Sequence, residues 1–121
     1  MTGLTAAMQA WFESFGWPVY CADDVPVGAQ LPYITVPAKD PGWDMKCSYQ
    51  VQLWAYTKEN ASLIQQANAI CAAVHAGVRI PFQGGVAVLW PDTPLQQVIP
   101  NGNVRRVLIL LSMNAYHCPG M

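Results

Sequence analysis

Charge is what this sequence has least of. Only 11% of its 121 residues are Asp, Glu, Lys or Arg, whereas a typical soluble domain is about 25% charged. Apolar residues make up 53%, so there are too few charges to coat the surface in the ordinary way. Either much of the surface is neutral and polar, or part of it is covered by partner chains. The composition favours the second arrangement.

The charges that are present form no basic stripe, and the net charge is −1. A nucleic-acid duplex is therefore not expected as a partner, and direct reading of DNA or RNA is not expected. No apolar run approaches the roughly 18 to 20 residues of a membrane helix. The start of the chain, Met1 to Leu4, lacks the basic and apolar blocks of a signal peptide. We expect neither a membrane partner nor export.

The sequence also lacks the spacing of a disulfide framework or a zinc site. Cys21, Cys47, Cys71 and Cys118 are far apart and form no CxxC motif, so reduced thiols are expected. Gly84-Gly85 matches neither the phosphate-binding loop nor the dinucleotide fingerprint. These motifs therefore give no support for a nucleotide cofactor.

Few residues remain as candidates for chemistry. His75 follows Cys71 by four residues in a predicted helix, a spacing that two metal ligands can share, but no second pair occurs at metal spacing. A helix-end histidine, favoured by the helix dipole, is the simpler interpretation. The carboxylates of Asp23, Asp24 and the 40–44 segment read as solvated loop charges. We predict no catalytic residue, metal or cofactor, with a small ligand- or metal-binding domain or enzyme as the alternative.

The most regular stretch is a predicted strand over residues 46–57, followed by a helix. Its side chains alternate, as expected of a strand with one apolar and one wetter face. The apolar face consists of Tyr49, Val51, Leu53 and Ala55. The opposite face is polar but uncharged at Ser48, Gln50 and Gln52, and becomes aromatic at Trp54 and Tyr56.

Two helices are predicted from apolar residues at three- and four-residue spacing. The first, capped by Thr2 or Thr5 and ended by Gly16, has the stripe Leu4, Met8, Trp11, Phe12 and Phe15. The second covers 60–76 and ends at Gly77, with the stripe Leu63, Ala67, Ile70 and Val74, joined by Ile64 and Cys71.

The remaining apolar runs predict strands at 31–37, at 86–90 and from 104 onward. Shorter candidates are an edge strand at 19–21, an extended segment at 78–81 and a strand-like segment at 95–99. Strand 31–37 should pair antiparallel with 46–57. The segment 91–94 contains two prolines and should break its strand. The last strand is apolar on both faces, so it should be central and covered twice. The chain therefore predicts one α+β domain, a mixed or antiparallel sheet of about four to five strands with two main helices.

Five residues are predicted to contact partners. Trp43 lies in a Pro-Gly loop, where an aromatic side chain is available for binding. Gln50 and Gln52 lie on the uncharged face of strand 46–57. Arg105 and Arg106 stand at the start of the last strand and either bind acidic groups or form an ordinary edge charge pair.

The order of these pieces resembles the tail terminator, or tail-completion, proteins of tailed phages and prophages. The resemblance covers about residues 4 to 116. It rests on Leu31 to Val36, Trp43, Tyr49 to Trp54, the helix 61–76, the Gly84-Gly85 step toward Trp90-Pro91, and Val104 to Ile109. It is a pattern of order and spacing, and this chain is richer in Trp and Cys than the family pattern.

The resemblance implies a structural subunit without catalytic residues. It implies a ring, commonly a hexamer, that caps the tail tube protein and offers its other face to the head-completion or connector protein. Such a protein is assembled in the cytoplasm of a bacterial host and ends in the virion, at the head-proximal end of the tail. A further alternative is a module that docks on another protein by adding a strand at the 31–37 edge.

Overall fold

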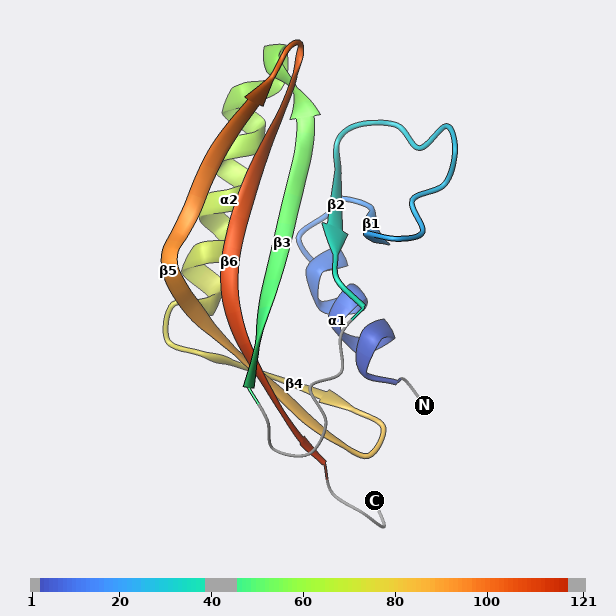
Figure 1. Ribbon diagram of the computed structural model, residues 1–121, viewed down its shortest axis with the longest axis vertical. Helices are drawn as coiled ribbons and strands as arrows, with labels where there is room; N and C mark the ends of the chain where they lie inside the picture. The colour runs from blue at the N-terminus through green and yellow to red at the C-terminus, as the bar shows by residue number, and fades with distance from the viewer. Residues whose placement is uncertain (1–2, 39–45, 118–121) are drawn as a thin grey trace.

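The computed structural model describes residues 3–38 and 46–117, which form two helices and one six-stranded sheet (Figure 1). The elements in order are α1 (Leu4–Glu13), β1 (Val19–Cys21), β2 (Tyr33–Val36), β3 (Lys46–Tyr56), the 3₁₀ turn η1 (Thr57–Glu59), α2 (Asn60–Val74), β4 (Val78–Phe82), β5 (Gly85–Asn101) and β6 (Val104–His117). The α+β class is confirmed. The predicted four to five strands are too few, because the short segments β1 and β4 both join the sheet.

The strand order is β1-β2-β3-β6-β5-β4. Only β1 and β2 run parallel, so the sheet is mixed, as predicted. The predicted antiparallel pairing of β2 with β3 is confirmed, with Ile34 opposite Leu53. The long strands β3 and β6 pair from Lys46 opposite Asn114 to Tyr56 opposite Val104, and they form the middle of the sheet.

The prolines after Trp90 do not break β5, contrary to the sequence prediction. The strand is continuous from Gly85 to Asn101, and its pairing with β6 shifts register between Pro91 and Gln96. A proline has no N–H for the ladder, so it is tolerated where a bulge takes residues out of regular pairing. The bulge therefore accommodates the prolines, and β5 is one long strand where the sequence predicted two short ones.

Both helices pack on one side of the sheet (Figure 1). The predicted stripe of α2 is confirmed, since Leu63, Ala67, Ile70 and Val74 are its buried residues. Helix α1 buries Leu4, Ala7, Met8 and Phe12. Its N-cap is Gly3, with no side-chain capping bond, so the predicted threonine cap is wrong. Neither helix is long and apolar enough to cross a membrane, as far as the described residues go.

Strand β6 is central, as predicted, but it is covered on one face only. Val107, Ile109 and Leu111 point into the core and are fully buried. Leu108 and Leu110 point to the opposite face and are only partly buried. The prediction of cover on both faces is therefore wrong for the single chain, because within the described residues both helices pack on the same side.

Candidate interaction face

The side of the sheet away from the helices is covered by no helix or strand among the described residues. We call it the outer face. Its side chains alternate with the buried ones along β3, β5 and β6. They include Lys46, Ser48, Gln50, Gln52, Trp54, Val86, Val88, Trp90, Asp92, Gln97, Ile99, Arg106, Leu108, Leu110, Ser112, Asn114 and Tyr116. Most are apolar or neutral, so this face is an unusual surface for an isolated domain.

Near one end of the outer face, an arginine and two aromatic side chains form a connected cluster, which we call the Trp54–Arg106 cluster. The Arg106 guanidinium lies over the Trp54 ring, 5.2 Å from its centroid, and its Nη1 donates to Gln52 Oε1 at 2.8 Å. The indole Nε1 of Trp54 donates to Thr35 Oγ1 at 3.0 Å. The Tyr33 ring is 6.3 Å from that of Trp54.

The cross-strand register explains why these residues meet. Tyr33 lies opposite Trp54, and Trp54 lies opposite Arg106, so the three form one row across β2, β3 and β6. A guanidinium that is stacked on an indole and bonded to an amide is held in one orientation. The cluster is therefore a rigid aromatic platform with a fixed positive charge, suited to contact a partner without reordering its side chains.

The structure brings together some of the predicted contact residues and separates others. Gln50, Gln52 and Arg106 share the outer face, with Gln50 exposed opposite Leu110. Arg105 lies on the helix side, partly buried, where its Nη1 donates to Asn60 Oδ1 at 3.0 Å and ties β6 to the start of α2. Trp43 lies outside the described residues.

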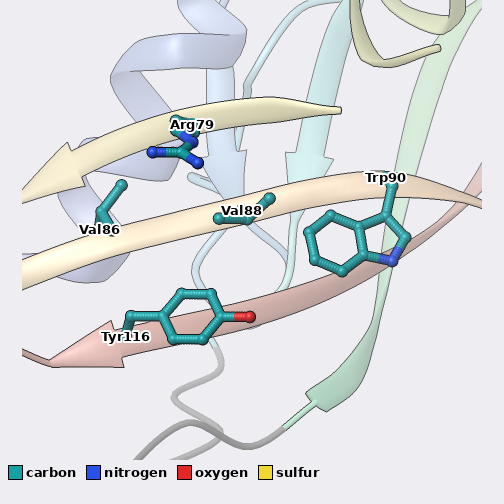
Figure 2. Close-up of a pocket in the computed structure, with 5 residues that line it drawn as sticks. All are labelled: Arg79, Val86, Val88, Trp90 and Tyr116. Carbon is teal, nitrogen blue, oxygen red and sulfur yellow. The ribbon is translucent and has the colours of Figure 1, made fainter. Parts of the chain in front are cut away.

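Sequence reasoning missed a second feature of the outer face, a depression of about 410 Å³. It is lined by Arg79, Val86, Val88, Trp90 and Tyr116 (Figure 2). Figure 2 shows Val88 on β5 between Arg79 on β4 and Tyr116 on β6, with Trp90 farther along β5. The signal was present in the sequence, because 86–90 is apolar on both of its alternating faces. Without the sheet order, the partner strands could not be assigned.

The candidates for metal binding or nucleophilic chemistry lie apart from both features. Cys71 is partly buried, its Sγ donates to Gln96 Oε1 at 3.4 Å, and burial raises the pKa of its thiol. A raised pKa disfavours the thiolate that metal binding or nucleophilic attack needs. His75 is exposed at the end of α2. Across residues 3–38 and 46–117, no three His, Cys, Asp or Glu side chains gather as a metal site would require.

Tyr49, in the core, is a described titratable group whose pKa is strongly shifted. The Tyr49 hydroxyl is buried and has no hydrogen-bond partner within the described part of the chain. Burial raises the pKa of Tyr49 well above its ordinary value, and the nearby Cys21 and Cys47 add to the rise. Its ring stacks on that of Phe12 in α1, with centroids 6.2 Å apart. Tyr49 therefore joins helix to sheet, and it opens onto no cavity among those described.

Comparisons with known proteins support the fold and do not identify the chain. No family model matches the sequence, and no similar protein was found among curated ones. A solved structure whose name states no function shares the fold with a TM-score of 0.57, over 93% of this chain and 90% of that chain. The two sequences are 16% identical, so the likeness concerns the arrangement of helices and strands alone.

Proposed function

We propose that this chain is a structural subunit of a tailed phage or prophage, a tail terminator or tail-completion protein. In this proposal, copies of the chain form a ring, commonly a hexamer, that caps the tail tube and helps to join the tail to the head. The observation that carries the proposal is the outer face, a broad sheet surface whose side chains are mostly apolar or neutral and that no described element covers. The element order that resembles the tail-terminator family supports it further.

The outer face suits burial against other protein chains better than contact with water. Leu108, Leu110 and Trp90 remain partly exposed on it, and Tyr116 is exposed. Monomeric proteins rarely expose a continuous apolar surface of this kind, and protein interfaces are rich in Trp, Tyr and Arg. The 11% charge content of the whole chain has the same explanation, because a ring subunit needs fewer solvated side chains.

The polar part of the outer face suits specific contacts. Ser48 and Gln50 are exposed on β3, and Gln52 is held by Arg106. Amide and hydroxyl groups form hydrogen bonds across an interface without the desolvation cost of buried charges. Within the proposal, the ring contacts the tail tube protein on one side and the head-completion or connector protein on the other, in the virion, after assembly in the bacterial cytoplasm.

The alternatives receive less support. A metal- or ligand-binding domain or enzyme would use Cys71 and His75, yet Cys71 already donates to Gln96. Docking by strand addition at 31–37 is wrong as stated, because β2 is flanked by β1 and β3. Metal analysis of the purified protein discriminates the first alternative: bound metal that disappears in Cys71→Ala and in His75→Ala would favour it.

Deletion of the gene from the phage that encodes the chain tests the proposal. We expect complete heads and unjoined tails, or tails of uncontrolled length, in electron micrographs of the lysate. Expression of the wild-type chain from a plasmid should restore joined virions. Normal virions in its absence would refute the proposed function.

A further inference from the structure

We propose that the depression of Figure 2 receives the loop between β1 and β2 of a second copy of this chain. This inference rests on the proposed function, because it names the contact that links neighbouring subunits of the ring. The loop covers residues 22–32, and its carboxylates Asp23 and Asp24 precede the apolar residues Val25, Pro26 and Val27.

The depression has an apolar floor and cations beside it. Val86, Val88, Trp90 and Tyr116 supply the apolar and aromatic surface (Figure 2). The sheet register then places two cations at the ends of one row, with Arg79 opposite Val88, Val88 opposite Asn114, and Asn114 opposite Lys46. An occupant that carries carboxylates next to apolar side chains would match both parts of this surface.

Arg79 and Lys46 differ from the other cations that the structure describes. Arg105 donates to Asn60, Arg106 donates to Gln52, and Lys58 lies over a tyrosine ring. Within residues 3–38 and 46–117, neither Arg79 nor Lys46 has an ion pair or a side-chain hydrogen bond. These two charges are therefore available to a partner.

One acid lies close to the depression, but it has its own partner. Asp92 follows Trp90 by two residues on β5, and its Oδ2 accepts from Ser112 Oγ at 3.5 Å. Asp92 carries one negative charge against the two positive charges of Arg79 and Lys46, so the outer face around Val88 keeps a net positive charge. Asn114 orients the ring of Tyr116 beside the depression, because its Nδ2 donates to the Tyr116 hydroxyl at 3.1 Å.

The loop has the complementary chemistry. Asp23 and Asp24 are exposed, and within the described residues their carboxylates have no ion pair or hydrogen bond. Val27 is 107% exposed, the most exposed large apolar side chain described. An apolar side chain held fully in water beside two unpaired carboxylates is unfavourable in an isolated molecule and favourable in an interface.

The loop between β1 and β2 is also preorganised by hydrogen bonds within its own backbone. The Asp24 N–H donates to the Cys21 carbonyl at 2.9 Å, and the Ala29 N–H donates to the Pro26 carbonyl at 3.1 Å. Gly28 has φ +87°, a conformation that favours glycine in a turn of this kind. These local bonds lower the entropy that the loop loses on docking.

The position of the two surfaces requires a second molecule. Strands β1 and β4 are the two edges of the sheet, and Figure 1 shows the loop projecting at the upper right while β4 lies at the lower end. A contact between two different surfaces is head-to-tail, and its repetition closes into a ring or extends as a filament. The loop and the depression therefore provide the kind of contact that a ring needs.

Charge reversal tests this contact on the full-length protein. The variants are Arg79→Glu, the double variant Asp23→Lys/Asp24→Lys, and the triple variant that combines them. Lys58→Glu and Glu13→Lys are the matched controls, because both residues are exposed and belong to neither surface. Circular dichroism melting checks that each variant folds, and sedimentation velocity from 1 µM to 1 mM, at 50 mM and 500 mM salt, measures association.

We expect Arg79→Glu and the double variant each to weaken association at least about tenfold, because each places like charges together. The triple variant should regain most of the loss, and the controls should match the wild type. A wild-type protein that stays monomeric at 1 mM overturns the inference, as do reversals without effect or a triple variant that recovers nothing. Oligomers unaffected by the reversals would overturn this contact alone, whereas normal virions after gene deletion would overturn the proposed function.

Discussion

Two adjacent leucines on β6 provide a direct comparison of the two faces of the sheet. Leu111 points into the core and is 0% exposed, while Leu110 points to the outer face opposite Gln50. Replacing a fully buried leucine by alanine costs about 2–5 kcal/mol, since burial is lost and a cavity is left. We expect this cost for Leu111→Ala. For Leu110→Ala we expect less than about 1.5 kcal/mol in the isolated subunit, because its side chain is already partly in water.

The assay is urea unfolding at several protein concentrations, with sedimentation velocity on the same samples. The part of the stability that rises with concentration reports association. Leu111→Ala should lose stability at every concentration. Leu110→Ala should lose little in dilute solution and should lose association at high concentration. Equal losses for the two variants in dilute monomer would refute the reasoning, because the outer face would then already be covered within one chain.

Three further predictions concern the fold that holds this face. Tyr49→Phe should raise the free energy of unfolding by about 1 kcal/mol, since it removes a buried hydroxyl that has no hydrogen-bond partner among the described residues. Because the pKa of Tyr49 is higher in the folded than in the unfolded chain, the wild type should also lose stability relative to this variant as pH rises above about 10. Gly85→Ala should cost at least about 1–3 kcal/mol in thermal melts, because the new Cβ would lie 2.1 Å from a backbone oxygen, whereas Gly3→Ala, with nothing within 4 Å, should change little. Thr35→Val should cost about 1–2 kcal/mol in urea unfolding, because it leaves the Trp54 N–H without its acceptor; a change below 0.5 kcal/mol would contradict this role.

Local patterns in the sequence predict much of this fold. The alternation over 46–57 and the stripe of 60–76 predict which side chains of β3 and α2 are buried, because each element repeats with a fixed period. Turn residues predict that β2 and β3 form an antiparallel pair. The number of strands in the sheet cannot be predicted from local sequence patterns. Strands β1 and β4 are three and five residues long, and only their neighbours in the sheet make them strands.

Two other predictions about the sheet were wrong, each because a local pattern does not show what the rest of the sheet does. The prolines in 91–94 disfavour regular pairing, but a register shift between Pro91 and Gln96 lets β5 continue past them. Leu108 and Leu110 indicate apolar surroundings on both faces of β6, yet in one chain the helices cover only one. A sequence pattern indicates that a side chain is buried, but it does not indicate whether it is buried by the same chain or by a partner chain.

The candidate site shows the same limit. Gln50, Gln52 and Arg106 could be predicted to share a face, because strand alternation and pairing place them there. Arg105 could not be separated from Arg106 without the register that turns it toward Asn60. The grouping of Arg79, Trp90 and Tyr116 depends on the order β4-β5-β6, which no local pattern encodes.

The central claim is that the outer face is an assembly surface, and native mass spectrometry of the wild type beside Leu108→Asp tests it most directly. Leu108 lies in the middle of this face, opposite Gln52 on β3 and Gln97 on β5. The account predicts a closed oligomer for the wild type and a folded monomer for the variant, since a buried unpaired carboxylate is not tolerated in an interface. A wild-type monomer at all concentrations, or a variant that assembles like the wild type, would contradict it.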